Sequence, residues 1–536
     1  MSSADRGLAR NSAIMAAGSL VSRLLGVIRT SMLFGVFAYS APGQAWTVAT
    51  TLPNMINLLL AGGVLNAVLV PQITKAAQQR QGGQEFVERL LTLTVLLIAG
   101  VTLLALPLAP LLVRLYASGF TPATTSLAVA FALICLPAIF FYGLYTMLGQ
   151  VLNARGQFAA FMWSPALCNV IWVAGIALFI RQHGTNSARS PDWTWPMIWL
   201  MAGTLTVGVA AQALVLILPL WRGGFRFRPR AGFRNAGLGT AGRVAGWTFA
   251  SLALSQVSFL VVSRVLTPVA EPDPNLTGYQ NAFLLFMTPH GLITVSVVTA
   301  LFTRLSVAAH RRDLSALRGD VGQGLRVVAV SMIPITVATF ALAGPGMRVL
   351  YPANTAAETA SQATLVVAMV LGLAPLGALY LAQRTFYAFE DARTPFLLAA
   401  VNSGLVIVGT LLCLLLPSQT RALGVCLVQS LGNLVAAVVA VICVGLRLRG
   451  FAIGPVIRTV VRSLVASAPA GAAAFLVAWA ISTGVSGRGG TLLALLVGVP
   501  VFVIGYVAVA RRIDLVELAQ LLRRLPHPIR RFLSFW

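Results

Sequence analysis

Residues 12–34, SAIMAAGSLVSRLLGVIRTSMLF, form one apolar run whose charged members are Arg23 and Arg29. A helix that spans a bilayer needs about 20 mostly apolar residues, so this run is long enough to cross a membrane. Runs of the same kind recur to residue 510, separated by charged or Pro- and Gly-rich breaks. The pattern predicts an all-α polytopic membrane protein.

We predict fourteen transmembrane helices. Their approximate bounds are 12–34, 45–71, 90–113, 124–149, 158–180, 195–221, 244–266, 278–303, 325–347, 361–383, 396–417, 422–446, 464–483 and 491–510.

Composition excludes a water-soluble protein. Hydrophobic residues make up 58% of the 536 and charged residues only 10%, whereas soluble domains carry about 25% charged residues. The 38 basic residues exceed the 13 acidic ones, but they fall in short clusters between apolar runs. We therefore expect a membrane partner and no nucleic acid, which would need a solvated basic face. The five cysteines lack metal-ligand spacing and no nucleotide-binding loop is present, so we expect no metal and no cofactor.

The basic residues also predict the orientation. With a cytoplasmic N-terminus, 29 of them lie in cytoplasmic segments and seven lie outside. Because cytoplasmic loops are enriched in Lys and Arg, both chain ends are expected in the cytoplasm.

An internal repeat organises the chain. Four short matches recur in order at a nearly constant offset of 235 to 238 residues; they pair Ser19–Leu24 with Ser255–Leu260, Pro110–Tyr116 with Pro345–Tyr351, Pro137 with Pro375, and Ala154–Phe158 with Ala392–Phe396. The repeated unit is six spans, and an even number keeps both copies in the same orientation. We expect two parallel six-helix lobes around a central cleft, plus two C-terminal helices. The predicted domains are an N-lobe (1–221), a basic cytoplasmic linker (222–243), a C-lobe (244–446), the extra helices (447–510) and a basic amphipathic tail (511–536).

Charges within the membrane suggest the substrate class. All thirteen acidic residues fall outside the predicted apolar spans, in loops or tails, whereas Arg23 and Arg29 lie inside the first span. Cation and proton pumps usually keep an intramembrane carboxylate, while the planar guanidinium of arginine pairs with phosphate. The pattern favours an anionic, phosphate-bearing substrate. Each arginine also has an interpretation without a ligand. Arg29 would extend to the outer interface of the membrane, and Arg23 would donate hydrogen bonds to backbone carbonyls.

Proline and glycine breaks mark possible hinges. The candidate cleft and hinge residues are Ser22, Gly26, Pro53, Asn54, Asn57, Gly62, Gly63, Pro289 and His290. His290 follows Pro289 in the eighth span and either titrates during transport or is a satisfied interior histidine.

Several of these motifs resemble the MurJ/MviN family. They are Ser22-Arg23-Leu24-Leu25-Gly26-Val27-Ile28-Arg29, Leu52-Pro53-Asn54, Gly62-Gly63-Val64-Leu65, Val70-Pro71, Pro289-His290-Gly291 and Asp391-Ala392-Arg393-Thr394-Pro395. The resemblance implies a flippase of lipid II, the undecaprenyl-pyrophosphate-linked peptidoglycan precursor, that works by alternating access. It implies that Arg23 and Arg29 bind the pyrophosphate, that residues 464–510 form a groove for the lipid tail, and that wall-synthesis or division proteins are possible partners. The arginine-rich, lysine-poor composition is typical of an actinobacterial member.

The chain departs from the family pattern at the cleft. The position three residues after Leu-Pro-Asn, an arginine in well-studied members, is Asn57, and a second family arginine is replaced by Leu284. A family glutamate is replaced by Met287 and a second-span acid by Gln44. We predict a non-enzymatic lipid II flippase. The alternatives are a flippase for another polyprenyl-linked glycan, a cation or drug antiporter of the same superfamily, and a cell-wall scaffold that transports nothing.

Overall fold

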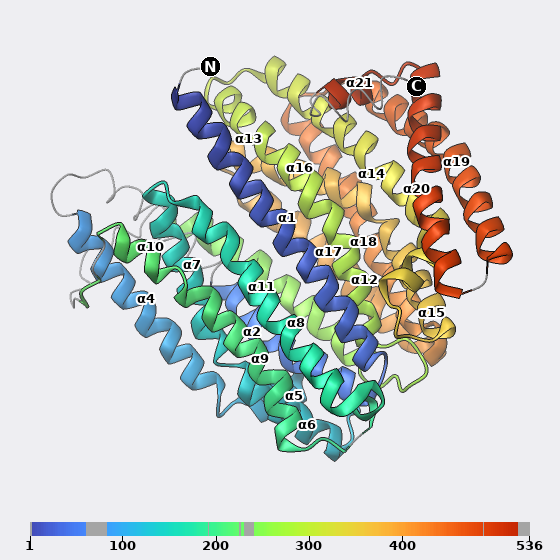
Figure 1. Ribbon diagram of the computed structural model, residues 1–536. Helices are drawn as coiled ribbons and strands as arrows, with labels where there is room; N and C mark the ends of the chain where they lie inside the picture. Colours follow the sequence, from blue (N-terminus) through green and yellow to red (C-terminus); the bar gives the residue numbers. More distant parts are fainter. Residues whose placement is uncertain are drawn as a thin grey trace. The chain divides into compact units, whose positions relative to one another are not determined.

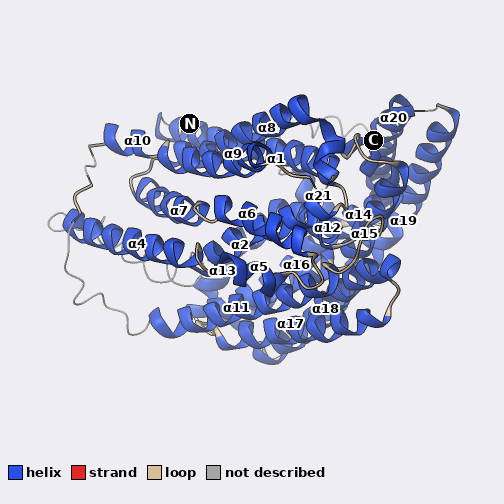
Figure 2. Ribbon diagram, turned by 90° about the horizontal axis from the view of Figure 1, so that it is seen from below, coloured by secondary structure: helices blue, strands red, loops and turns tan. Residues whose placement is uncertain are grey.

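The computed structural model describes residues 3–60, 83–190, 192–224, 227–229, 241–485 and 487–523. Within these ranges the chain forms helices and loops and no strand (Figures 1 and 2). It divides into two compact units, Met1–Glu271 and Pro272–Trp536.

Ten helices belong to the described part of the first unit. They are α1 (Ser3–Phe37), α2 (Ala41–Leu59), α4 (Gly83–Ala105), α5 (Ala109–Tyr116), α6 (Pro122–Cys135), α7 (Ala138–Ala154), α8 (Phe158–Arg189), α9 (Trp195–Leu214), α10 (Ile217–Arg222) and α11 (Ala241–Leu266). Aromatic side chains fill the core of this unit: Phe131 meets Trp46 with ring centroids 5.3 Å apart and Trp193 at 5.1 Å. Edge-to-face pairs of this kind add about 0.5–1.5 kcal/mol each beyond the area that they bury.

Helix α1 packs along the length of α8 (Figure 1). The absence of a side chain at Gly18 allows this approach, because a Cβ atom there would lie 2.8 Å from the indole of Trp163. The same indole donates a hydrogen bond to the carbonyl oxygen of Ile14 at 3.1 Å. The α1–α8 pair therefore has close backbone packing at one end of the apolar run that opens the chain.

Helix α11 packs against α5 and α2 of the first unit. Ser263 donates a hydrogen bond to the carbonyl of Tyr116, and Thr267 donates one to the carbonyl of Ser118. Gln44 of α2 donates to the carbonyl of Val269 at 2.9 Å. The first compact unit thus contains the helix at 241–266, whereas the sequence repeat assigns that segment to the second lobe.

The second unit contains the remaining described helices. They are α12 (Leu276–Pro289), the π-helix η2 (His290–Thr294), α13 (Val295–His310), α14 (Leu314–Leu350), α15 (Ala356–Val370), α16 (Leu373–Ala388), α17 (Arg393–Leu412), the 3-10 helix η3 (Cys413–Leu415), α18 (Ser418–Arg447), α19 (Ile453–Gly484), α20 (Gly487–Arg512) and α21 (Val516–Arg523). Helices α19 and α20 pack on each other and on α14. Alanines at 466, 470, 474 and 478 line this contact on α19, and such small residues let membrane helices approach closely.

The described residues contain 12 helices long and apolar enough to cross a membrane, or 13 if the bent pair Leu91–Ala105 and Ala109–Tyr116 is one span. The exact count of fourteen is therefore not confirmed. The difference is the predicted span at 45–71, because residues 61–71 lie outside the described part of the chain. The bend in the pair measures 73° and falls at residues 106–108, where Pro107 has no backbone N–H to donate.

The prediction that every carboxylate lies in a loop or tail is wrong. Asp320 lies in α14 and is only 6% exposed, and Glu88 lies in α4 and is 2% exposed. Helix α14 begins eleven residues before its predicted apolar span, because Asp313 caps its first turn by accepting a hydrogen bond from the Ala316 N–H. Asp320 is paired with Arg304 there. Likewise Arg384, which we expected in a loop, lies in the last turns of α16.

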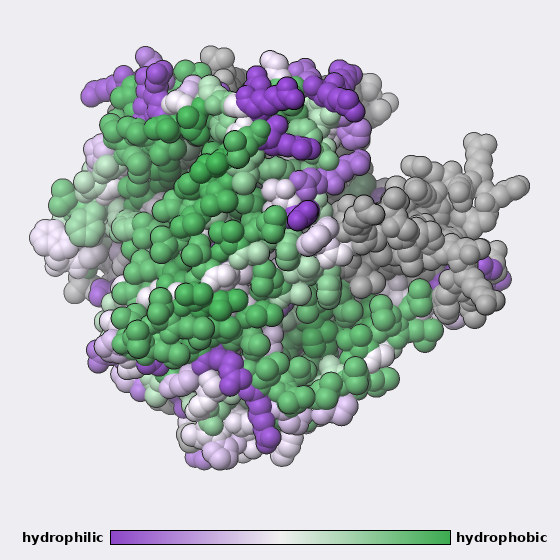
Figure 3. Space-filling model, turned by 180° about the vertical axis from the view of Figure 1, so that it is seen from behind, coloured by the Kyte–Doolittle hydropathy of each residue, from purple (hydrophilic) through white to green (hydrophobic). Residues whose placement is uncertain are grey.

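The exterior of the helices is largely apolar. On the face drawn in Figure 3, hydrophobic side chains cover the helical surface and hydrophilic ones gather at the helix ends. Large apolar side chains lie on this exterior, among them Leu103, 67% exposed, and Leu446, 76% exposed. A lipid environment accounts for this surface, since a soluble monomer rarely exposes apolar patches of this extent.

Candidate functional site: the interior arginine of the first unit

Arg29 lies on α1 with its guanidinium against α8. Its Nη1 donates a hydrogen bond to Oδ1 of Asn169 at 2.8 Å. Its Cζ lies 4.1 Å from the centre of the Trp172 ring, a cation–π contact. The Nε atom is buried and makes no hydrogen bond. Arg29 has no carboxylate partner among the residues that the structure describes, so its charge is balanced only by an amide oxygen and an aromatic face.

Asn169 fixes this arrangement by bonding to two parts of α1. Its amide nitrogen donates to the carbonyl oxygen of Ser22 at 2.9 Å, while its oxygen accepts from Arg29. The side chain is 7% exposed. Gly26 lies between the two contacts on the same helix, and a Cβ there would be in ordinary van der Waals contact with Nδ2 of Asn169, at 3.9 Å. Of the predicted cleft residues, Ser22, Gly26 and Arg29 are thus brought together around Asn169.

The sequence analysis did not identify Asn169 or Trp172. An asparagine within an apolar run is a signal that could have drawn attention, since polar residues in spans cost free energy unless they find partners. Its partner lies 140 residues away, and no local pattern reveals a contact at that separation.

Arg23 lies on an exposed part of α1, beside Leu20 and Leu24, which are 55% and 57% exposed. Six residues separate it from Arg29, so the two side chains leave the helix about 120° apart. The structure therefore holds Arg29 against α8 and leaves Arg23 away from that contact.

The second-span candidates are only partly described. Pro53 is buried within α2, while Asn54 is exposed. Oδ1 of Asn57 is buried without a hydrogen-bond partner. Gly62 and Gly63 lie outside the described residues.

Pro289 and His290 lie at a break in the second unit. Pro289 ends α12, and His290 begins the π-helical turn η2. His290 is 4% exposed, its Nδ1 has no hydrogen-bond partner, and its ring meets Tyr380 edge-on at 5.5 Å. Single π-helical turns often occur at functional positions, because they shift the helical register locally.

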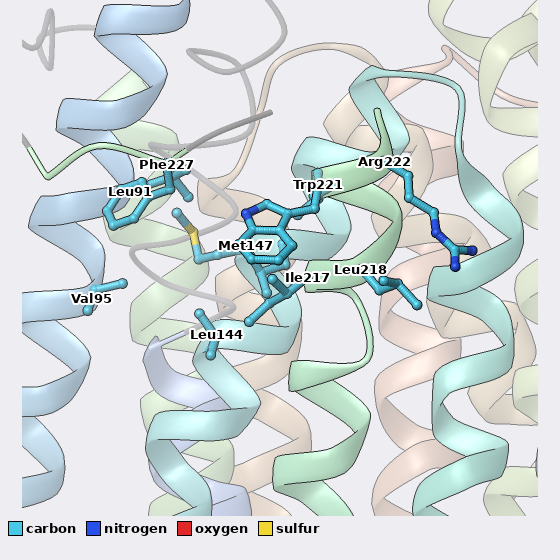
Figure 4. A pocket seen from close by; sticks show the side chains of 11 residues that line it. Leu91, Val95, Leu144, Met147, Ile217, Leu218, Trp221, Arg222 and Phe227 are labelled. Atoms are coloured by element: carbon cyan, nitrogen blue, oxygen red, sulfur yellow. The ribbon is translucent and has the colours of Figure 1, made fainter. Parts of the chain in front are cut away.

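An apolar cavity of about 730 Å³ opens elsewhere in the first unit, between α4, α7 and α10. Leu91, Met147 and Trp221 point into it, whereas the guanidinium of Arg222 extends away (Figure 4). The described lining is apolar apart from Arg222, and Arg29 is not part of it.

The apolar helices define a class of protein, a multi-pass α-helical membrane protein. A solved structure titled "Lipid II flippase MurJ, inward closed conformation" matches with a TM-score of 0.70 at 20% identity, covering 93% of this chain and 99% of that one. An inward-facing MATE family transporter of the MOP superfamily matches with a TM-score of 0.63 at 15% identity, covering 80% and 94%.

Sequence comparison identifies the family. The model of the family "Lipid II flippase MurJ" matches residues 31–497. The probable lipid II flippase MurJ of Synechocystis sp. is 26% identical over 459 residues, covering 84% of each chain. The lipid II flippase MurJ of Burkholderia cenocepacia is 25% identical, and the match covers 71% of this chain and 73% of that protein. This chain belongs to the MurJ family.

Proposed function

We propose that this protein moves lipid II from the inner to the outer leaflet of the plasma membrane by alternating access. The observation that carries the proposal is Arg29, an interior arginine held by Asn169 and Trp172 with no carboxylate partner among the described residues. Membership of the MurJ family supplies the substrate, because the curated relatives are named for lipid II flipping.

In this proposal Arg29 and Arg23 bind the pyrophosphate. A guanidinium offers parallel N–H donors that fit two phosphate oxygens. Asn169 occupies Nη1, and the Trp172 face orients the plane of the Arg29 guanidinium, so Nη2 is the nitrogen that would receive an oxyanion. Arg23, on an exposed part of the same helix, would meet the head group first. Rotation about its long side chain would bring it toward the same ligand.

The proposed topology places both termini in the cytoplasm, with the six-helix lobes 1–221 and 244–446 moving about the breaks at Pro53, Gly62-Gly63 and Pro289. Helices α19 and α20 would guide the prenyl tail, and the segment 511–536 would lie on the anionic inner leaflet. Wall-synthesis or division proteins are the proposed partners.

A flippase for another polyprenyl-linked glycan is the second candidate. Asn57 and Leu284 stand where the family pattern has arginines, and a different head group would be held by a different set of contacts. A cation antiporter is disfavoured, because the described carboxylates Asp320 and Glu517 are paired with Arg304 and Arg326 rather than left for a cation.

The test measures the fraction of lipid II that an impermeant outer-face probe reaches, before and after depletion of this protein in its host. We expect total lipid II to rise and the exposed fraction to fall. Wild type and Arg114→Gln, which removes an exposed charge from α5, should restore exposure. Arg29→Gln should restore lipid II exposure with an efficiency at least about tenfold lower than that of wild type. The reason is that a charge-assisted hydrogen bond contributes about 1.5–3 kcal/mol.

An unchanged exposed fraction after depletion, in a host shown to have no second flippase, would contradict lipid II as the substrate. If exposure falls but Arg29→Gln restores it like wild type, the substrate stands and the assignment of Arg29 is wrong.

A further inference from the structure

Arg384 of the second unit is a half-buried arginine enclosed by aromatic rings. Its Cζ lies 5.0 Å from the centre of the Tyr380 ring, 5.8 Å from Phe302 and 5.9 Å from Tyr387. Its Nη2 donates a hydrogen bond to the hydroxyl of Tyr380 at 2.8 Å. These contacts come from α16 itself and from α13, and they fix the plane of the guanidinium.

Three other arginines of the second unit have oxygen acceptors of a kind that Arg384 lacks. Arg304 pairs with Asp320, Arg326 with Glu517 at 2.7 Å, and Arg318 donates to the carbonyl of Leu448 at 2.9 Å. Arg384 makes neither an ion pair nor a bond to a carbonyl in the described part of the chain, where the Tyr380 hydroxyl is its one acceptor. Most of its N–H donors are therefore available to a ligand.

The helix end explains part of this placement but not all of it. Arg384 lies one turn before the end of α16 at Ala388, and the helix dipole favours a cation there by about 0.3–1 kcal/mol. The dipole supplies no hydrogen-bond partner to the guanidinium. An aromatic enclosure with free donors matches the way in which proteins present arginine to carboxylates and phosphates.

Tyr380 connects Arg384 to the π-helical break. Tyr380 touches the ring of His290 at 5.5 Å while its hydroxyl accepts from Arg384. In the same break Nδ1 of His290 and Oγ1 of Thr294 are buried without hydrogen-bond partners. Buried polar atoms of this kind cost free energy unless a ligand or water satisfies them.

We propose that Arg384, oriented by Tyr380, is an oxyanion-binding residue that takes a phosphate of a lipid head group. Its position near a helix end suits head-group depth rather than the centre of the bilayer. That this phosphate belongs to lipid II rests on the function proposed above, and it gives the second unit an anchor of its own for the substrate. The ring contacts with Phe302 and Tyr387 would keep the guanidinium edge toward the ligand.

The experiment measures binding to the purified full chain in phosphatidylcholine nanodiscs with two probes, lipid II and phosphatidylglycerol. We expect Arg384→Gln to weaken lipid II binding at least about tenfold, because charge-assisted bonds are lost. Tyr380→Phe keeps the ring and removes the hydroxyl, so it should weaken binding by about threefold to tenfold. The matched control is Arg447→Gln, which removes an exposed arginine stacked 5.0 Å from Phe389 and should change binding less than about twofold.

The two probes separate the possible outcomes. Selective loss of lipid II binding supports the proposal, while equal loss of both probes supports the oxyanion site but replaces its ligand by membrane phospholipid. Wild-type affinity in folded Arg384→Gln and Tyr380→Phe overturns the inference and leaves the proposed function standing, since that depends on Arg29. If wild type binds no lipid II, the proposed function fails, and the phosphatidylglycerol titration alone then decides whether Arg384 binds phosphate.

Discussion

Asn169 should be energetically coupled to Arg29, and the structure gives the size of the coupling. Asn169→Ala removes the acceptor of a charge-assisted bond at 2.8 Å, which contributes about 1.5–3 kcal/mol. It also removes the bond to the Ser22 carbonyl at 2.9 Å, for which membrane proteins give about 0.6 kcal/mol on average. The free energy of unfolding should therefore fall by about 2–3.5 kcal/mol.

A double-mutant cycle isolates the pair. Arg29→Met keeps an unbranched aliphatic stem and introduces no donor, so in its presence Asn169→Ala should cost only the Ser22 bond. The coupling energy should be about 1.5–3 kcal/mol. The assay is reversible unfolding in mixed micelles, followed by lipid II exposure in depleted cells, where Asn169→Ala should impair restoration because Arg29 is no longer positioned.

The control is Thr206→Ala, which removes a neutral hydrogen bond from α9 to the Ile134 carbonyl in the same unit. It should lower stability by about 1 kcal/mol or less and leave lipid II exposure unchanged. A coupling energy below about 0.5 kcal/mol between Asn169 and Arg29 would refute the reasoning, because independent sites add within that margin.

Two further predictions concern helix packing. Glu517→Gln should weaken the packing of α21 on α14, because it breaks the 2.7 Å ion pair with Arg326. Trypsin should then cleave after Arg523 several-fold faster. Equal cleavage in Glu517→Gln and in the exposed control Glu390→Gln would contradict this. Gly175→Ala should lower stability by about 1–3 kcal/mol, because the new Cβ would lie 2.5 Å from atoms of Thr204. Gly404→Ala, with nothing within 4 Å, should be neutral or slightly stabilising, and matching melting temperatures for the two glycine variants would argue against the close α8–α9 contact.

Most of the helices could be predicted from the sequence because a membrane span needs about 20 apolar residues whatever its neighbours are. It misjudged α14, whose first turns are polar and are stabilised by the Asp313 cap and the Arg304–Asp320 pair. Hydropathy averages detect apolar cores and miss helical extensions of this kind. Capping residues and paired charges mark such extensions in the folded protein.

The site was predicted in part. The charge pattern identified Arg29, but its partners Asn169 and Trp172 come from α8, and the pairing depends on how the two helices pack. Arg384 was counted among loop arginines because it lies beyond the apolar stretch, although α16 continues to Ala388. The roles of Arg23 and the second-span candidates remain predictions.

The contacts of α11 have a consequence for biogenesis. The repeat begins its second copy with this helix, yet Ser263 and Thr267 bond to the residues that follow α5, and Gln44 bonds to Val269. The hydrogen bond between Gln44 and Val269 joins residues 225 positions apart. The native contacts of the first unit are therefore completed only after α11, the seventh predicted span, has been synthesised. When only the first six predicted spans have been synthesised, the first unit is incomplete. The residues that follow α5 then remain accessible to chaperones and proteases. The predicted six-span repeat and the compact unit that contains α11 therefore end at different helices.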